Sequence, residues 1–290
     1  MILCLDVGGT EIKAAPVSEM GELLCPVKKY PAKAALPKEA LLTHFAEIME
    51  DLAGEAKERS VRGIHLAFPG PFDYENGISL LRGLDKYDAL YGENLRRELK
   101  SRLNFPELLE QNMKFINDVS AFTKGEMKFG AAAGFRRCLF VCIGTGCGSA
   151  FGMDGQLCDG SEEGVPKDGY LYPLPYRDGC MDDYFSKRGL ERLTKEMLGT
   201  SMDGKMLSKC VQNGRKEAKR CFLTFGEMLC EALSPVLNDF HPDCLCVGGQ
   251  ITKSADFFLQ PLCEFCRKSG IFLYVTENTS VKTIQGLSTL

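Results

Sequence analysis

Residues suited to binding phosphate gather at the first turn of the chain, in the stretch LCLDVGGTEIKAAPV. There an apolar strand ends on an acid, a turn of small residues follows, and a second strand carries a lysine. These residues are Asp6, Gly8, Gly9, Thr10 and Lys13. Glycine lets backbone N–H groups converge on an oxygen-rich ligand, and such a concavity binds phosphate. Asp6 would repel phosphate, so we expect it to hold a hydrated Mg²⁺, while Lys13 neutralises phosphate charge.

The same pattern returns in the second half of the chain, in LFVCIGTGCGSAFGMDGQL. Aligning Asp6 with Cys142 places Gly8 on Gly144. The second turn comprises Gly144, Thr145 and Gly146. One glycine hairpin is common and needs no ligand. Two at corresponding positions, one preceded by an aspartate, favour a nucleotide site in which the two turns face each other across a cleft.

A third polar group, Asn117 and Asp118, stands where the strand KFIND passes into a helix. Asp118 can act as the N-cap of that helix, which would explain an aspartate here without any catalysis. Alternatively, both side chains project at the carboxyl end of the strand. Asp118 would then accept the proton of a substrate hydroxyl while a γ-phosphoryl group is transferred to it. This stretch alone leaves both interpretations open.

Strands alternate with helices along the chain, which is typical of the α/β class. Strands are expected at residues 2–7, 11–18, 22–30, 61–68, 114–118, 244–249 and 271–276, with two more within 139–157. Helices are expected from about Pro37 to Arg59, at 93–103, 119–134, 181–198, 203–213, 216–240 and 257–269, and at the end of the chain. The strand CVGGQI ends at Gly248 and Gly249, where backbone can lie flat against an adenine or ribose.

Composition narrows the class of protein. The chain has 290 residues, is 44% hydrophobic and carries a formal net charge of −4, so we expect a globular protein that binds neither nucleic acid nor an anionic membrane. Its apolar runs are too short for a membrane span or a signal peptide, which predicts a cytoplasmic location. The 14 cysteines are then expected to be reduced, and the three histidines have no ligand-like spacing.

With these pieces in this order, the sequence resembles the ROK family (repressor, open reading frame, kinase) of sugar kinases and their relatives. The matching stretches are LDVGGTEIK, FPGPFDYENG, INDVSAFTKGE, CIGTGCGSAFGMDGQL, DGCMDDYFSKRGL and CVGGQI. The resemblance implies a duplicated actin-like (ribonuclease H-like) ATPase fold with two lobes around a central nucleotide and sugar cleft. We expect these lobes at residues 1–117 and 118–290, with the last helix packing back on the first lobe.

The resemblance also implies roles for single residues. Asp118 would be the general base, Asn117 a ligand of sugar hydroxyls, and Pro69 and Gly70 part of the sugar-side loop. ATP phosphates would be held by Gly8, Gly9, Thr10, Lys13, Gly144, Thr145 and Gly146, and adenosine would lie beside Gly248 and Gly249. Asp6 would hold Mg²⁺ through water. The first residues already form a strand, so we do not expect the helix-turn-helix of the repressor branch.

The chain departs from the family in the segment GSEEGVPKDGYLYPLPYRDGC. Family members carry here a glutamate and a histidine that contact the sugar, and three cysteines that bind zinc with that histidine. Counting back from Cys180, two zinc cysteines fall on Pro173 and Pro175, the histidine on Tyr170 and the glutamate on Lys167. One cysteine without a histidine cannot make a tetrahedral zinc site. We therefore predict no structural zinc, with prolines and packed tyrosines stiffening the loop instead.

The same departure bears on the substrate. Lys167 and Tyr170 offer donors where a carboxylate would accept, so the preferred sugar need not be glucose or an N-acetylhexosamine. Glu162 or Glu163 could supply the missing acceptor through a shifted alignment. Lys167 could pair with an acidic substituent on the substrate.

The expected function is transfer of the γ-phosphoryl group of ATP, with Mg²⁺, to a hydroxyl of a hexose or hexose derivative. Two alternatives remain. One is a non-catalytic sugar-sensing protein that keeps the fold, and the other is a chaperone-like ATP hydrolase, against which the missing peptide-binding domain argues. The partners expected are a small-molecule sugar and a second copy of the chain in a homodimer.

Overall fold

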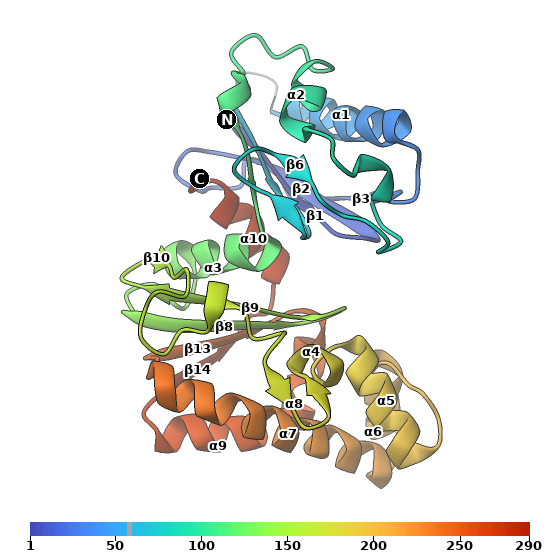
Figure 1. Cartoon of the computed structure of the whole chain (residues 1–290), viewed down its shortest axis with the longest axis vertical. Helices are drawn as coiled ribbons and strands as arrows, with labels where there is room; N and C mark the ends of the chain where they lie inside the picture. Colours follow the sequence, from blue (N-terminus) through green and yellow to red (C-terminus); the bar gives the residue numbers. More distant parts are fainter. Residues whose placement is uncertain (57–59) are drawn as a thin grey trace. The chain divides into compact units, whose positions relative to one another are not determined.

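The computed structural model describes residues 1–56 and 60–290 (Figure 1). The chain divides into two compact units, Met1–Gly130 with Ser280–Leu290, and Ala131–Thr279. The boundary expected between residues 117 and 118 therefore falls inside the first unit, because the helix after Asn117 and the last helix of the chain both belong to it. Within the described residues, no helix is long and apolar enough to cross a bilayer.

The first unit is built on a five-stranded mixed sheet. Its strands are β1 (Ile2–Val7), β2 (Glu11–Val17), β3 (Lys28–Pro31), β4 (Gly63–Ala67) and β7 (Met113–Ile116), in the order β3-β2-β1-β4-β7. Strands β1 to β3 form an antiparallel meander, and β4 and β7 run parallel to β1. Its helices are α1 (Lys38–Glu55), α2 (Leu95–Lys100), α3 (Asp118–Phe129) and α10 (Thr279–Leu287), with short elements β5 (Phe72–Asp73), β6 (Ile78–Ser79), η1 (Asp88–Leu90) and η2 (Glu110–Asn112).

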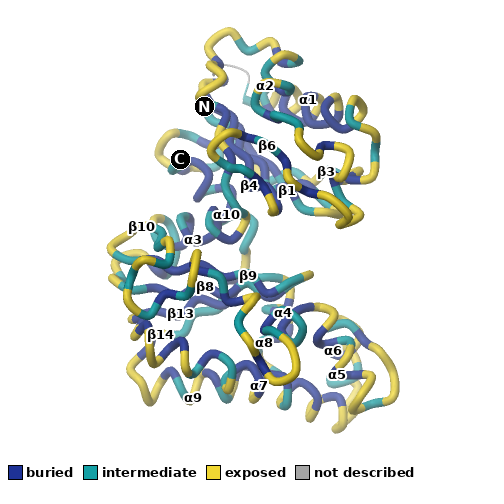
Figure 2. The backbone as a smooth tube through the Cα atoms, viewed as in Figure 1, coloured by how far each residue is buried: buried dark blue, intermediate teal, exposed yellow. Residues whose placement is uncertain are grey.

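Alternation along β1 separates the two faces of this sheet. Leu3 and Leu5 pack with the apolar face of α1, whereas Cys4 packs with residues of α3 and α10 on the other face. Helix α1 accordingly lies on one side of the sheet and α10 on the other (Figures 1 and 2). Helices α3 and α10 cross closely, because a Cβ added at Gly125 would clash with the carbonyl oxygen of Lys282. The ring of His65 lies 2.7 Å, Nδ1 to O, from the carbonyl of Leu287 and ties α10 to β4.

The second unit repeats this sheet topology. Its strands are β8 (Arg137–Ile143), β9 (Cys147–Met153), β10 (Gln156–Leu157), β13 (Cys244–Gly248) and β14 (Phe272–Val275), in the order β10-β9-β8-β13-β14. Here too the first three strands are antiparallel, and β13 and β14 are parallel to β8. Strand for strand, the order and directions match those of the first sheet. The predicted duplication of one α/β half is therefore confirmed.

Helices cover one face of the second sheet, where the apolar side of α7 packs on β8 and β13 (Figure 1). They are α4 (Met181–Tyr184), α5 (Lys187–Leu198), α6 (Gly204–Gln212), α7 (Lys216–Phe240), α8 (Ala255–Phe258) and α9 (Gln260–Lys268), with short elements η3 (Lys167–Gly169), β11 (Pro175–Tyr176), β12 (Gly179–Cys180) and η4 (Gln250–Ser254).

Several element predictions need correction. The strand expected at 22–30 is reduced to β3, because Pro26 lacks an N–H for pairing and only a single bridge joins Val17 to Leu23. The helix expected at 181–198 breaks into α4 and α5, where the Ser186 side chain caps α5 by accepting from the Gly189 N–H at 3.3 Å. Helix α1 ends at Glu55, and residues 57–59 of the longer helix predicted there lie outside the described residues.

Candidate active site

One edge of the first sheet brings the predicted polar residues together. Strands β1, β4 and β7 are parallel neighbours, and their register pairs Asp6 with Ala67 and Ala67 with Ile116. Pro69 follows β4 two residues later, and Asn117 follows β7 directly. Because the carboxyl ends of parallel strands share an edge, residues distant in sequence meet here.

Asp6 lies at this edge beside Lys13 and Ser280. The β1–β2 register pairs Asp6 with Lys13, and the Lys13 Nζ donates a hydrogen bond to Ser280 Oγ at 2.7 Å. Burial raises the pKa of the Asp6 carboxyl from 3.8 to about 6, and the negative charge of Asp118 adds to this rise. Lys13 and a hydrogen bond from the Ser280 hydroxyl act in the opposite direction. Ser280 comes from α10, so nothing in the sequence near Asp6 could have indicated it.

Asn117, not Asp118, is the N-cap of α3. The Asn117 Oδ1 accepts hydrogen bonds from the N–H groups of Val119 at 2.9 Å and Ser120 at 3.3 Å. The capping interpretation of Asp118 is therefore wrong, because its neighbour already satisfies these first helical N–H groups. The Asn117 amide group also hydrogen-bonds to the Asp118 carboxylate, which lowers the pKa of that carboxyl, and a second N–H of the same group remains for a ligand.

Asp118 is the first residue of α3 and is open to solvent. Its Oδ1 accepts a hydrogen bond from the N–H of Val119 at 3.0 Å. The surrounding protein still removes enough hydration to raise the pKa of the Asp118 carboxyl, while the Val119 N–H and the positive charge of Lys86 oppose that rise. Asp118 is thus a carboxylate that solvent can reach and that binds a proton more readily than an ordinary surface aspartate.

Two hydrogen bonds hold the first glycine turn at Gly8. The N–H of Gly8 donates to the carbonyl of Glu11 at 3.1 Å, and the hydroxyl of Tyr87 donates to the carbonyl of Gly8 at 2.8 Å. A Cβ added at Gly8 would lie 2.8 Å from the Glu11 oxygen, so glycine is required there. Gly9 and Thr10 are exposed, which leaves the tip of the turn accessible.

The second glycine turn belongs to the second unit and is held by Asp182. The Asp182 Oδ1 accepts from the N–H of Cys147 at 2.7 Å, and its Oδ2 pairs with Arg188 at 2.8 Å. A Cβ added at Gly146 would lie 2.9 Å from that Oδ1, which explains the glycine. The N–H of Lys187, near the start of α5, donates to the carbonyl of Gly144 at 2.8 Å. Asp182 lies in the stretch DGCMDDYFSKRGL, but the sequence alone does not indicate its role at the turn.

The third glycine turn follows β13 in the second unit. Gly249 adopts φ 91°, and a Cβ there would clash with the carbonyl oxygen of Ile143. The N–H of Gly249 donates to Thr279 Oγ1 at 3.1 Å, so this amide is already engaged. A hollow of about 210 Å³ is lined by Thr252, Lys253, Val275, Thr276 and Glu277. At this turn the backbone of Gly249 therefore lies against that of Ile143, and a hollow lies nearby at Thr252.

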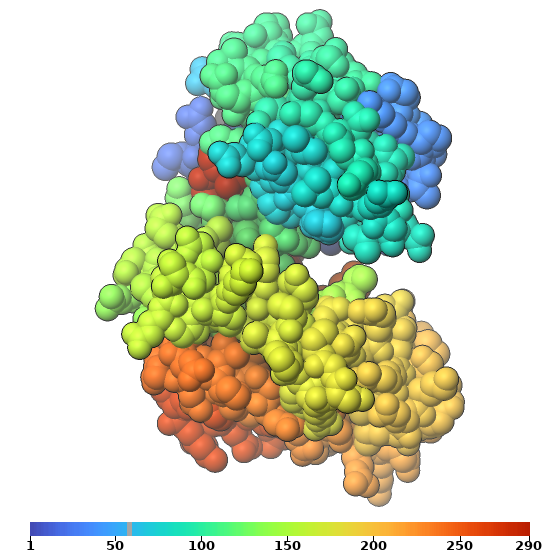
Figure 3. Space-filling view, viewed as in Figure 1, coloured from blue at the N-terminus to red at the C-terminus, as the bar shows by residue number. Residues whose placement is uncertain are grey.

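The loop of residues 160–180 lies at the surface of the second unit, in the yellow-green part of the chain (Figure 3). Glu162 accepts hydrogen bonds from the N–H groups of Asp159 and Gly160, both at 3.2 Å, so its carboxylate is used within the loop. Glu163 and Lys167 are exposed, and Tyr170 is half-buried with its ring 5.5 Å from that of Tyr172. Of the two glutamates, Glu163 is therefore the better placed to accept from a ligand.

Aromatic packing anchors the carboxyl-terminal part of this loop. The Tyr176 ring packs edge-on against Tyr184, with centroids 4.9 Å apart, and at a tilt against Phe185, with centroids 5.2 Å apart. Its hydroxyl donates to Glu231 Oε2 at 2.8 Å. Among the described residues, no group of three or more histidine, cysteine, aspartate or glutamate side chains is placed to hold a metal ion.

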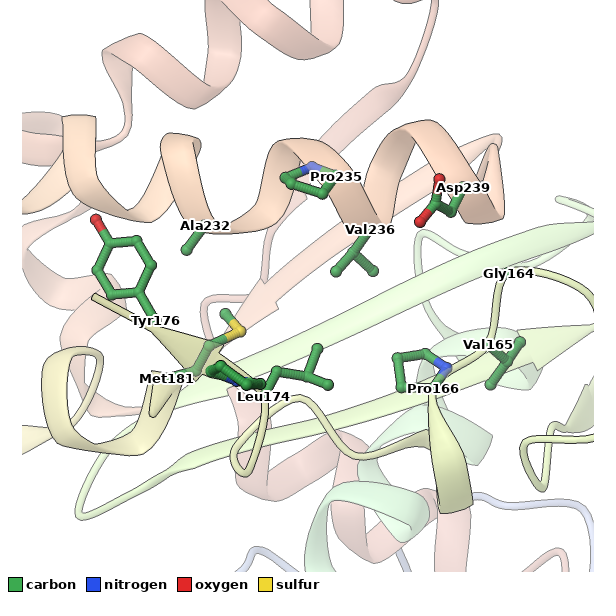
Figure 4. A pocket seen from close by; sticks show the side chains of 11 residues that line it. Gly164, Val165, Pro166, Leu174, Tyr176, Met181, Ala232, Pro235, Val236 and Asp239 are labelled. Carbon is green, nitrogen blue, oxygen red and sulfur yellow. The ribbon is translucent and has the colours of Figure 1, made fainter. Parts of the chain in front are cut away.

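A groove of about 480 Å³ runs between this loop and α7 (Figure 4). Apolar side chains dominate its lining, among them Leu174, Met181 and Val236, and Asp239 contributes a carboxylate. A sugar needs several converging polar groups, so this groove is a poor candidate for the sugar site. None of the predicted substrate residues lines it.

The loop expected to lie on the sugar side begins at Pro69, which is buried, and Gly70, which is exposed. The N–H of Phe68 donates to the carbonyl of Ile116 at 2.9 Å, which extends the β4–β7 pairing up to the start of this loop. The Tyr74 hydroxyl donates to the carbonyl of Phe68 at 3.0 Å. Pro69 and Gly70 thus leave the sheet at the edge that carries Asn117 and Asp118.

Two similar five-stranded sheets with glycine turns after their first strands define the class, an α/β protein of the actin-like ATPase fold. Residues 2–278 match the ROK family, and the chain belongs to that family. A glucokinase of Thermotoga maritima is 25% identical over 284 residues, which cover 91% of this chain and 86% of that protein. The DNA-binding transcriptional repressor Mlc of Escherichia coli is 23% identical, over 85% of this chain and 62% of its own.

A solved structure supports the fold. The ROK family glucokinase from Streptomyces griseus, in complex with glucose and AMPPNP, superposes with a TM-score of 0.72 at 20% identity, covering 99% of this chain and 98% of that one. At this identity the likeness establishes the fold and leaves the substrate of this chain to be argued from its own residues.

Proposed function

We propose that the protein is an ATP-dependent kinase that phosphorylates a hydroxyl of a hexose or hexose derivative. One observation carries the proposal: Asp118 lies at the same sheet edge as Asp6 and the first glycine turn, with an open carboxylate of raised pKa. The glucokinase of Thermotoga maritima, and the Streptomyces griseus glucokinase in complex with glucose and AMPPNP, support this reaction class.

Asp118 would act as the general base. As the acceptor oxygen attacks the γ-phosphorus, its proton passes to the Asp118 carboxylate and the bond to the leaving ADP breaks. A raised pKa suits this role because it brings the base closer to neutral pH. Asn117 would orient the acceptor through its amide nitrogen, since its oxygen is used to cap α3.

The nucleotide would be held by the three glycine turns. In the first unit these groups are Gly8, Gly9, Thr10 and Lys13, and in the second unit they are Gly144, Thr145, Gly146, Gly248 and Gly249. Because the amide of Gly249 already donates to Thr279, adenosine would rest against its backbone rather than bond to that N–H. The tip of the first turn is exposed and free to approach phosphate oxygens.

The residues present also fit Mg²⁺. Asp6 is one carboxylate at the phosphate turn, and its ionised form is disfavoured by burial and by the charge of Asp118, a cost that a cation would relieve. Mg²⁺ would be held by Asp6 through water and by the phosphates, where it would neutralise charge developing on the transferred group. Asp6 needs its proton removed for this task.

Two groups of residues are proposed for sugar recognition. Pro69, Gly70 and Asn117 would shape one side of the sugar, and Glu163, Lys167 and Tyr170 would supply polar contacts. Lys167 and Tyr170 are donors at positions that the family gives to a glutamate and a histidine. We therefore expect the preferred sugar to differ from glucose, and an acidic substituent would suit Lys167.

The test is ADP release with Mg²⁺-ATP against hexoses, amino sugars, N-acetyl sugars and sugar acids. Acceptor-dependent turnover is expected, and Asp118→Asn should reduce kcat by about 10²- to 10⁴-fold, the usual contribution of a general base. Asp256→Asn is the matched control, because it also alters an aspartate in the first turn of a helix, in α8. ADP release that does not depend on an acceptor would contradict the kinase and favour an ATP hydrolase.

A sugar-sensing protein without turnover is the second candidate. The observation in its favour is that Glu162 is used inside its own loop, which adds to the expected replacement of the family's sugar-binding glutamate and histidine by Lys167 and Tyr170. Calorimetry decides between the two functions. Sugar binding without any ADP formation would favour the sensor.

A further inference from the structure

A short segment before η1 holds one lysine against the first glycine turn. Lys86 lies between Asp85, with φ 54°, and Tyr87, with φ 57°. Two left-handed residues other than glycine on either side of one position are uncommon and cost free energy. Such backbone strain persists only where contacts with the surrounding structure hold the residues in that conformation, and it is found most often at functional sites.

Tyr87 is the anchor that enforces this conformation. Its side chain is fully buried, with ring centroids 5.3 Å from Phe68 and 6.0 Å from Phe45. Its N–H donates to the carbonyl of Ala34 at 2.8 Å, and its hydroxyl donates to the carbonyl of Gly8 at 2.8 Å. The residue next to Lys86 is thus bonded to the phosphate turn itself.

Lys86 extends along that turn. Its Cδ lies 3.4 Å from the position that a Cβ on Gly9 would occupy, so the side chain passes over the exposed glycine. Its charge is also among the influences on Asp118, where it favours the ionised carboxylate. Lys86 therefore lies beside the first glycine turn, which would hold the phosphates, and within electrostatic reach of Asp118, which would take the proton of the acceptor.

The ammonium of Lys86 is available to a ligand. Within residues 1–56 and 60–290, its ammonium forms no hydrogen bond or close ion pair, although its charge acts on Asp118 from a longer distance. Lys13, the lysine predicted for phosphate, instead donates to Ser280. The nearby carboxylate of Asp88 is occupied by the N–H groups of Gly83 and Leu84, at 3.0 and 3.3 Å.

We propose that Lys86 is a catalytic residue that contacts the γ-phosphoryl group of ATP and stabilises its charge during transfer. This inference rests on the proposed kinase function. During transfer, negative charge is spread over the three non-bridging oxygens while the acceptor proton passes to Asp118. The Lys86 ammonium stays protonated and donates a hydrogen bond to one of these oxygens, which is the role of a preorganised cation at developing charge.

The experiment compares Lys86→Met and Lys86→Arg with the wild type. In Lys86→Met we expect kcat to fall by about 100-fold or more, with KM for Mg²⁺-ATP changed much less, and Lys86→Arg should recover part of the loss. Lys100→Met, at the end of α2 in the same unit, is the control for loss of a lysine. A fall in kcat of less than about threefold in Lys86→Met would overturn the assignment.

A pH profile separates this role from a merely structural one. Lys86 is the charged group that acts on Asp118, and Asp118 in turn acts on Asp6, whose other charged neighbours are Lys13 and Glu11. Removing the Lys86 charge should move the acid limb of kcat/KM to higher pH, because that charge favours ionised Asp118. An unshifted limb together with lowered thermal stability would make Lys86 a structural residue and contradict the proposal.

Binding provides a readout that does not need turnover. Calorimetry with Mg²⁺-AMPPNP and Mg²⁺-ADP should show about a tenfold loss of affinity in Lys86→Met for AMPPNP alone, since only it carries a γ-phosphoryl group. Equal losses for both nucleotides, or none, would refute a γ-phosphoryl contact. If the wild type turns over no acceptor, the kinase function fails, and this comparison still decides whether Lys86 binds the γ-phosphoryl group.

Discussion

Replacing Asp6 by asparagine should raise the free energy of unfolding at neutral pH. In the acidic range, where the Asp6 carboxyl is protonated, the same substitution should have no such effect. Folding raises the pKa of this carboxyl from 3.8 to about 6. Between these two values the folded protein binds more protons than the unfolded chain, so the free energy of unfolding falls as pH rises. Above pH 6 the ionised carboxylate is retained in the fold at a net cost.

The size of this cost follows from the two pKa values. A difference of about two pKa units corresponds to about 3 kcal/mol, since each unit is worth about 1.4 kcal/mol. The favourable influence of Lys13 and Ser280 is already contained in this net value. Relative to the wild type, Asp6→Asn should therefore gain up to about 3 kcal/mol between about pH 3.5 and pH 8. Kinase activity should be lost in the same variant.

Urea unfolding followed by far-ultraviolet circular dichroism measures this difference, because the chain has no tryptophan to report by fluorescence. Asp51→Asn is the matched control with the opposite sign, since hydrogen bonds from Tyr30 and Lys28 lower the pKa of the Asp51 carboxyl. That control should lose stability relative to the wild type as pH rises through the acidic range. If the stability gained by Asp6→Asn were the same at pH 4 and pH 8, the reasoning about burial and the Asp118 charge would be refuted.

Three further predictions concern packing, the second turn and metal content. Gly125→Ala should lower the free energy of unfolding by about 1–3 kcal/mol or more, because its Cβ would meet the Lys282 carbonyl where α3 and α10 cross. Gly54→Ala has open space around its Cβ and should raise the free energy of unfolding by about 0.5–1 kcal/mol. Chemical denaturation compares the two variants. Gly146→Ala should push the Asp182 carboxylate off the Cys147 N–H and raise KM for Mg²⁺-ATP, and an unchanged KM would argue against a phosphate role for this turn. Prolonged EDTA treatment should leave the melting temperature unchanged, and elemental analysis that finds one zinc per chain would contradict the expectation of a zinc-free loop.

Local sequence patterns determined the elements and their duplication. Apolar runs ending at glycine turns sufficed to place β1, β8 and β13, since residue alternation and turn chemistry act over a few neighbouring residues. The recurrence of one hairpin pattern predicted two related halves, and the matching strand orders confirm it. The family assignment followed from these motifs taken together and is confirmed by the match over residues 2–278.

Tertiary structure decided which residues stand beside Asp6 and Asp118. Ser280 reaches Lys13 from a helix at the other end of the chain, and Tyr87 anchors the segment that aims Lys86 at the glycine turn. The sequence could not show these contacts, because they join residues tens to hundreds of positions apart and depend on how helices and loops pack on the sheet. The choice of Asn117 over Asp118 as helix cap is equally a matter of backbone geometry, since both residue types cap helices well. Short-range chemistry thus set the strands and turns of this protein, while long-range packing determined what surrounds its carboxylates and hence their proton affinity.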